Sequence, residues 1–332
     1  MPIDRPTLHQ ALDSSLVYAC SYPAAALQLS NHLPMTLTAL WQLGAPADAL
    51  EPQLQRAARR LAPLAAGSHE AEAARRYARE IEREGLPAVL RAEMPGLLRA
   101  AETAAFHGLI RLAYALSAEH DGETAHALAA WSTGRTSLGE DLPAGLGRRG
   151  TSIAAALEAL RGRSELSFQP RAGTTITSDL QACAALPGFE AAVSGPQAPG
   201  DDALTLDALA EASLAVYLAS RDFTALHLVT ACHAWRLVEP WSGLDEIEAC
   251  AARRGLWRAW LASWLSIGRP VPDFTAVHAG HAGEADWQAA LPTLASSPDE
   301  HRIKLAWTAL DEWHHRGWPG YARVLPSREA SA

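Results

Sequence analysis

Apolar residues recur at helical spacing along most of the chain. Residues 71–116 consist largely of strong helix formers, and breaks are predicted at Pro87 and Pro95. Residues 204–238 predict two consecutive helices, and the second is apolar on nearly every side, so it should be buried. Residues 253–268 carry three tryptophans at spacings of three and four, which favours core packing of one helix face over a substrate pocket. These tryptophans are Trp257, Trp260 and Trp264.

A further helix is predicted near the end of the sequence, which reads SSPDEHRIKLAWTALDEWHHRG. Ser297 can act as the N-cap, Pro298 suits the first helical position, and Glu300 completes a capping box. This start places His301 and Lys304 in the first turns of the helix and on the same face.

Strand signals are weak, and the best of them is RAGTTITSDL, residues 171–180. Gly- and Pro-rich stretches at residues 132–150 and 186–201 predict long loops. Within the first stretch, GLGRRG at residues 145–150 matches a dinucleotide-binding glycine pattern. Loop residues precede it instead of a buried strand, so we do not interpret it as a nucleotide site. We predict an all-α fold, a large single-domain helical bundle or array over residues 1–332 with long Gly- and Pro-rich loops.

The composition is that of an ordinary globular protein, with 48% hydrophobic and 20% charged residues among 332. A net charge of -9 argues against a nucleic-acid partner. We find no secretory signal and no apolar run of the roughly 18 residues that a membrane span needs, so we predict no membrane association. The cysteines lie far apart without a CxxC pair, which predicts a cytoplasmic protein without a disulfide framework. They are Cys20, Cys183, Cys232 and Cys250.

The 13 histidines fall into different contexts. Four lie in or beside apolar helices, namely His32, His107, His227 and His301. Taken singly, each is most simply a hydrogen-bonded core histidine, but four on separate helices suit a metal site inside a helical bundle. No HxxxH or HExxH spacing joins them, so spacing alone does not select them. Seven others are predicted to be solvated, namely His69, His120, His126, His278, His281, His314 and His315.

Lys304 is the only lysine among the 28 lysines and arginines of the chain. A compositional bias toward arginine explains most of this imbalance. The two side chains differ where chemistry needs an amine that can lose its proton, because arginine effectively cannot. The single exception, three residues after His301, is therefore a candidate functional residue.

Four segments together resemble the questin oxidase-like family. They read SNHLPMTLTALWQLGA, AAFHGLIRLAYAL, FTALHLVTACHAW and DEHRIKLAWTALDEW, and the resemblance runs from about residue 30 to about residue 315. The family includes oxygenases that open rings of aromatic polyketides such as anthraquinones, in a reaction described for some members as Baeyer–Villiger-like. The resemblance further implies a mononuclear iron site with histidine ligands and a carboxylated lysine.

Carried over residue by residue, the implied ligands are His32, His107, His227 and the HxxK pair His301 and Lys304. A lysine becomes a carbamate when its neutral amine attacks carbon dioxide, and burial together with a helix N-terminus disfavours the ammonium form. Four neutral imidazoles and one anionic oxygen suit Fe(II) or a similar first-row ion. Arginine has no free amine for this chemistry, so a lone lysine in an arginine-rich chain is what such a site would leave.

The expected function is that of an iron-dependent oxygenase that takes dioxygen and a small aromatic, polycyclic substrate. Candidate substrate contacts are Trp41, His233, Trp235 and Trp307. No residue stands out as a separate acid or base. If the reaction needs electrons, a diffusible donor such as NADPH would supply them, because we find no motif for binding one. No sequence feature specifies an oligomeric state.

Two other function classes stay open at this stage. One is a metal-dependent hydrolase with a carboxylated lysine, but such sites usually lie at the strand ends of α/β barrels, and strand signals are missing here. Metal identity and oxygen uptake would separate the two enzymes. The other is a non-enzymatic helical scaffold, for which removal of metal ions by a chelator would leave the stability unchanged.

Overall fold

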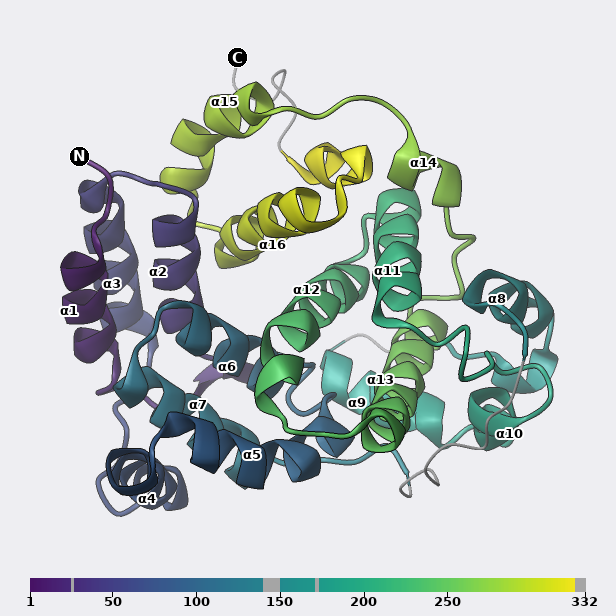
Figure 1. The fold of residues 1–332 in the computed structure, drawn as a ribbon, viewed down its shortest axis with the longest axis horizontal. Coiled ribbons are helices and arrows are strands. Elements are labelled where there is room, and N and C mark those ends of the chain that lie inside the picture. The colour runs from purple at the N-terminus through teal and green to yellow at the C-terminus, as the bar shows by residue number, and fades with distance from the viewer. Residues whose placement is uncertain (25–26, 140–149, 171–172, 326–332) are drawn as a thin grey trace. The chain divides into compact units, whose positions relative to one another are not determined.

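The computed structural model describes residues 1–24, 27–139, 150–170 and 173–325 (Figure 1). In these ranges the regular elements are helices and a single two-stranded hairpin, which confirms the all-α prediction. Residues 145–149 of the GLGRRG segment lie outside the described residues. No helix in the described ranges is both long and apolar enough to cross a membrane.

The chain divides into two compact units. The first unit comprises Met1–Leu86, Ile110–Thr133 and Thr275–Ala332, and the second comprises Pro87–Leu109 and Gly134–Phe274. Three helices contain a unit boundary, namely α5 (Leu86–Leu97), α6 (His107–Ser117) and α14 (Phe274–His278). The expectation of one domain over residues 1–332 stays a prediction.

In the first unit, α2 packs against α1 and α16, and α4 packs along α7. The helices are α1 (Arg5–Ser15), α2 (Leu33–Gln42), α3 (Leu50–Arg60), α4 (His69–Glu84), α7 (Asp121–Thr133), α15 (Glu284–Ala295) and α16 (Glu300–Arg316). The short 3₁₀ turns are η1 (Ala47–Ala49) and η5 (Pro319–Val324). Pro34 occupies the first turn of α2, as its sequence suggests, and the first eight residues of α2 are buried.

A hairpin of β1 (Ser21–Ala24) and β2 (Leu27–Ser30) precedes α2, and sequence reasoning missed it. Each strand has four residues and Pro23 interrupts the first, so no alternating run was long enough to detect. A two-stranded hairpin is marginal alone and needs support from other elements. Here Tyr22 is buried, and its hydroxyl accepts a hydrogen bond from Arg60 Nη2 at 2.6 Å.

In the second unit, α11 packs along α12, and α13 packs against α9. The helices are α8 (Ile153–Arg161), α9 (Ile176–Ala184), α10 (Phe189–Ser194), α11 (Leu206–Ser220), α12 (Phe223–Val238) and α13 (Glu246–Ser266), with 3₁₀ turns η2 (Leu98–Ala100), η3 (Ser164–Leu166) and η4 (Glu239–Trp241). Residues 224–235 of α12 are all buried, as predicted. Core packing of the tryptophans is also confirmed, because all three are buried and Trp260 Nε1 donates to Ser213 Oγ at 2.8 Å.

Two predictions about irregular segments are wrong. The strand candidate at residues 171–180 instead contains the start of α9, where Thr175 is the N-cap and forms a capping box with Ser178. That local hydrogen bonding outweighs the short β-branched run. The loop predicted at residues 186–201 contains the short helix α10. None of the four cysteines forms a disulfide, in agreement with the predicted absence of a disulfide framework.

Seven histidines were predicted to be solvated, and five of them are exposed in the structure. His120 is buried at the start of α7, where its Nδ1 accepts the Glu123 N–H at 2.9 Å and its Nε2 lies 3.2 Å from Asp13 Oδ1. The side chain therefore serves as a helix cap, a role that its polar sequence context concealed. His126 is only partly exposed, and burial lowers the pKa of its ring. The exposed ones are His69, His278, His281, His314 and His315.

Candidate metal centre

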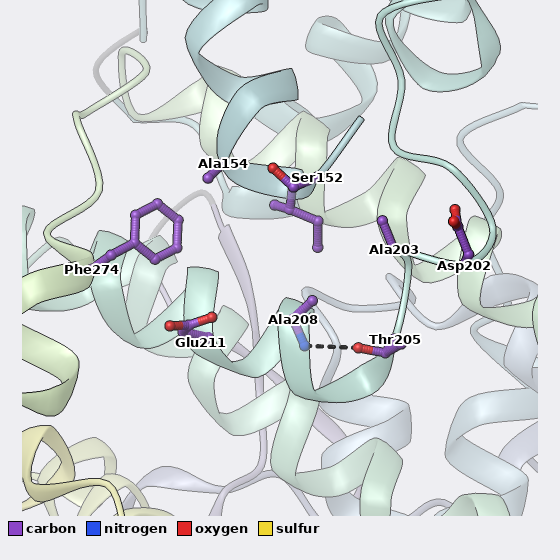
Figure 2. A pocket seen from close by; sticks show the side chains of 9 residues that line it. Ser152, Ala154, Asp202, Ala203, Thr205, Ala208, Glu211 and Phe274 are labelled. Atoms are coloured by element: carbon purple, nitrogen blue, oxygen red, sulfur yellow. Dashed lines mark hydrogen bonds between the residues drawn. The ribbon is translucent and has the colours of Figure 1, made fainter. Parts of the chain in front are cut away.

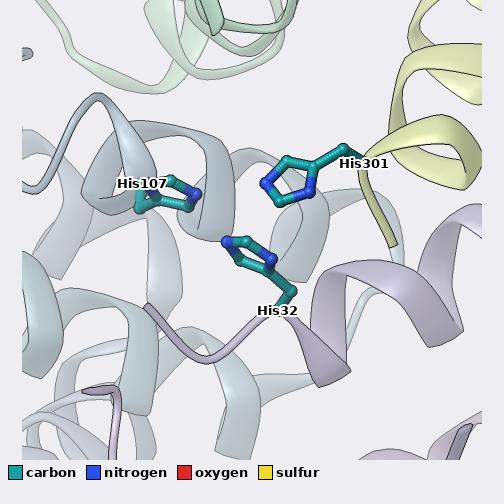
Figure 3. Close-up of side chains that lie close together, drawn as sticks. All are labelled: His32, His107 and His301. Atoms are coloured by element: carbon teal, nitrogen blue, oxygen red, sulfur yellow. The ribbon is translucent and has the colours of Figure 1, made fainter. Parts of the chain in front are cut away.

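Within the first unit, His32 and His301 lie together although they are far apart in sequence. His32 immediately precedes α2, and His301 is the second residue of α16, which packs against α2. The two ring centroids are 4.5 Å apart, and the rings meet edge to face at 86° (Figure 3). This packing of two helix starts brings two of the predicted ligands together.

Lys304 follows on the next turn of α16 and is 2% exposed. Burial lowers the pKa of its amine to about 7, although the nearby carboxylates of Glu300 and Asp299 favour the ammonium form. The predicted burial is thus confirmed, and a neutral amine is within reach at neutral pH. Carboxylation of this amine stays a prediction.

The N-cap of α16 differs from the one predicted. Asp299, not Ser297, is the cap, and its Oδ1 accepts the His301 N–H at 2.9 Å. Ser297 instead accepts the Asp299 N–H at 3.1 Å. The helix therefore begins at Glu300, because the carboxylate is the stronger acceptor near a helix N-terminus. His301 and Lys304 keep their predicted places in the first two turns.

The second unit contains the other two predicted histidine ligands. His107 is the first residue of α6 (Figure 3), and its ring centroid lies 5.1 Å from that of His227 on α12. Three consecutive left-handed residues precede His107, with φ angles of 52° at Ala104, 56° at Ala105 and 68° at Phe106. Left-handed backbone costs roughly 1–2 kcal/mol per non-glycine residue. Strain of this kind is typically retained where it positions a functional group.

Hydrogen bonds to oxygen orient three of the four rings. His107 Nδ1 lies 2.5 Å from the Ala104 carbonyl oxygen, and His227 Nδ1 lies 2.8 Å from that of Phe223. A carbonyl only accepts, so Nδ1 must carry the proton and Nε2 keeps the lone pair. His32 Nδ1 is 3.1 Å from Glu300 Oε2, which imposes the same tautomer when the carboxylate is ionised. Metal-binding histidines almost always have this arrangement.

The fourth ring, that of His301, is neutral for a different reason. Burial lowers its pKa to about 4, with a smaller contribution from the charge of Lys304. Its Nδ1 faces Asp299 Oδ1 at 3.6 Å. All the side chains implied by sequence therefore fit a metal ion in chemical type, since neutral imidazoles and a readily deprotonated amine are the forms that a first-row ion needs.

Comparison with known families adds to this geometry. A model of the questin oxidase-like family matches residues 29–309. The chain belongs to the questin oxidase-like family. The match includes both histidine pairs and Lys304, and membership indicates an oxidoreductase, an oxidase acting on polyketide-type substrates. A search of curated proteins finds no match.

The predicted substrate contacts of this questin oxidase-like protein occupy different environments. Trp41 is partly exposed in the last turn of α2, with the Arg5 guanidinium 5.9 Å from its ring centre. Trp307 is buried with its ring edge to face on Tyr114 at 4.2 Å. His233 and Trp235 are fully buried in α12. A role in substrate binding stays a prediction for all four.

Sequence reasoning missed two residues beside the predicted ligands. Glu300 was assigned only to helix capping, but its carboxylate contacts His32. Phe223, the first residue of α12, contributes the carbonyl that orients His227, and its ring centroid lies 4.8 Å from the His227 ring. The Phe223 side chain is 51% exposed. Its position four residues before a histidine in a predicted helix was the one sequence feature that could have indicated this contact.

A cavity of about 520 Å³ lies in the second unit of this questin oxidase-like protein (Figure 2). Ser152 and Ala154 at the start of α8 line one side, and Glu211 of α11 and Phe274 line another. None of its lining residues is a predicted ligand or substrate contact. We therefore do not assign the reaction to this cavity.

Proposed function

We propose that this protein is a non-haem iron oxygenase that opens a ring of an aromatic, polycyclic polyketide-type substrate. The ligands would be the four histidines and a carboxylated Lys304. The observation that carries the proposal is the set of Nδ1 contacts to oxygen, which leaves Nε2 of His32, His107 and His227 as the donor nitrogen. Family membership supports the oxidase class.

Lys304 would supply the negative charge of the centre. Its neutral amine attacks the carbon of carbon dioxide, and the carbamic acid that forms loses a proton to leave a carbamate anion. The low pKa of about 7 makes the neutral amine available for this step. The helix N-terminus, one turn away, stabilises the resulting anion. When bound, Fe(II) would supply the one-electron chemistry that activates dioxygen.

Ring opening of the Baeyer–Villiger type would insert one oxygen atom between a ring carbonyl carbon and its neighbour to give a lactone, and water would then hydrolyse the new ester bond to open the ring. The second oxygen atom of dioxygen is then reduced to water, which takes two electrons and two protons. A diffusible donor such as NADPH would supply them. The protein's own contribution would be to hold the aromatic substrate near the centre, and the partly exposed Phe223 ring beside His227 would stack on it.

The two alternative functions are less well supported. A carboxylated-lysine hydrolase of the barrel type would need parallel strands, and the described ranges contain only the β1–β2 hairpin. A scaffold with an accidental lysine is disfavoured energetically. With a pKa of about 7 instead of 10.5, the buried amine costs the fold on the order of 5 kcal/mol at neutral pH and below. That cost falls as the pH rises from 7 toward 10.5.

Oxygen consumption tests the proposed function. We expect iron-loaded protein to consume dioxygen in the presence of an anthraquinone-type substrate, and label from isotopically marked dioxygen to appear in a ring-opened product. Chelated protein should do neither. The assay is run with and without NADPH, so that a requirement for the donor is measured directly. Hydrolysis without oxygen uptake, or inertness of the iron-loaded protein toward a substrate panel, would contradict the proposal.

A further inference from the structure

His32 differs from the other predicted ligands in what holds its ring. His107 and His227 are oriented by backbone carbonyls, which no substitution can remove. His32 Nδ1 instead contacts a side chain, Glu300 Oε2, at 3.1 Å. Both side chains are largely shielded from water, with exposures of 11% for His32 and 20% for Glu300. A charge-assisted hydrogen bond in such surroundings is stronger than one in water.

The second oxygen of Glu300 has a partner of its own. Arg60, the last residue of α3, places Nη1 3.6 Å from Glu300 Oε1. The same guanidinium donates from Nη2 to the Tyr22 hydroxyl at 2.6 Å and lies 5.5 Å from the centre of the Tyr22 ring. Four residues therefore form one chain of contacts, Tyr22–Arg60–Glu300–His32, which joins the β1–β2 hairpin to a predicted ligand.

We infer that Glu300 is a positioning residue, which accepts the His32 Nδ1–H hydrogen bond and so presents Nε2 to the metal ion. Arg60 fixes the carboxylate in turn, and Tyr22 fixes Arg60, which gives the hairpin a function in building the centre. This inference rests on the proposed function. It adds a group outside the ligand set whose charge and geometry would set the affinity for the ion, since partners of this kind typically contribute 10–100-fold.

Glu300 also has a simpler possible role, because an acidic first residue stabilises any helix through the helix dipole. The chain offers a matched control. Glu246 is likewise the first residue of a helix, α13, and follows an aspartate N-cap, Asp245, as Glu300 follows Asp299. Glu246 is exposed and lies in the second unit. Glu246→Gln therefore removes the same helix-start charge without touching the chain of contacts to His32.

The experiment measures Co(II) binding by the full-length protein, using affinity and the visible absorption spectrum of the bound ion. We expect Glu300→Gln to raise the dissociation constant by about 10–100-fold and to shift the spectrum. Arg60→Met should change affinity in the same direction by a smaller factor, whereas Glu246→Gln should bind as the wild type does. Circular dichroism of each variant verifies folding, and the near-isosteric Gln keeps the packing at residue 300.

A double-mutant cycle separates positioning from a general structural effect. In a His32→Ala background, Glu300→Gln should have little further effect on the dissociation constant, because its contact is already gone. The inference would be overturned if Glu300→Gln bound Co(II) with wild-type affinity and spectrum. It would also be overturned if this substitution raised the dissociation constant by the same factor with and without His32. Neither result would contradict the metal centre itself. Failure of the wild-type protein to bind Co(II) would overturn the proposed centre and this inference together.

Discussion

Lys304→Arg is expected to abolish metal binding and activity together. A guanidinium cannot take up carbon dioxide and cannot ligate a cation. It would also bring a fixed positive charge to a position that is 2% exposed and close to the predicted ligand His301. At an effective dielectric of about 20, two unit charges some 4 Å apart repel by about 4 kcal/mol, and a divalent ion increases this. Metal content and oxygen consumption of the purified variant are the measurements.

Arg302→Lys is the matched control for that substitution, because Arg302 is exposed two residues earlier on the same helix. It should leave metal content and activity unchanged. Lys304→Ala should lose the anionic ligand but leave space, so added bicarbonate or a short carboxylate should restore part of the function. Two results together would contradict a functional role for Lys304, namely full activity of Lys304→Arg and an unmodified amine at residue 304 in the electron density of the wild-type protein. The single lysine would then be explained by compositional bias alone.

The pH dependence of reconstitution follows from the same residue. The pKa of the Lys304 amine is lowered to about 7, so its neutral fraction grows as the pH rises through 7. Only the neutral amine attacks carbon dioxide. Iron uptake by metal-free protein in the presence of bicarbonate should therefore increase through this pH range, and uptake should be impaired when carbon dioxide is removed.

His107→Ala and His227→Ala are each expected to abolish metal retention, whereas His314→Ala and His315→Ala should retain the full metal content. The first two remove donor nitrogens whose tautomer the backbone imposes. The other two are exposed near the end of α16, where His314 Nε2 lies 2.8 Å from the exposed Glu284 carboxylate. Elemental analysis after gel filtration measures the retained metal.

Truncating a buried histidine also leaves a void, and voids destabilise proteins. His233→Ala controls for this effect, because His233 is fully buried on the same helix as His227 but is not a predicted ligand. It should lose stability in thermal denaturation and still retain metal. Equal metal loss from His233→Ala and His227→Ala, or metal loss from the exposed pair alone, would show that the ligand assignment is wrong.

The sequence predicted the fold best where one strong signal dominated. The all-round apolar pattern of residues 224–238 correctly indicated a buried helix, and the tryptophan spacing in α13 correctly indicated a core face. The β1–β2 hairpin was missed because four-residue strands carry too few alternating positions. The start of α9 was missed because a Thr–Ser capping box outweighed β-branched residues beside it.

The site was predicted only in part, for physical reasons. The resemblance to a family supplied the ligand set, since no local spacing joins histidines that lie on separate helices. Glu300 was invisible as a partner of His32 because 268 residues separate them. The left-handed turn before His107 was also invisible, because Ala104, Ala105 and Phe106 carry no sequence signal for positive φ angles.

Metal analysis of the purified full-length chain, expressed with iron supplied, tests the central claim most directly. Four neutral imidazoles and one carbamate form one mononuclear ligand set, so we expect about one iron per chain. Intact-mass spectrometry and an electron-density map of the same sample should show one added carboxyl group on Lys304. A protein that contains no transition metal, and that binds neither Fe(II) nor Co(II) added back with bicarbonate, would contradict the proposed centre.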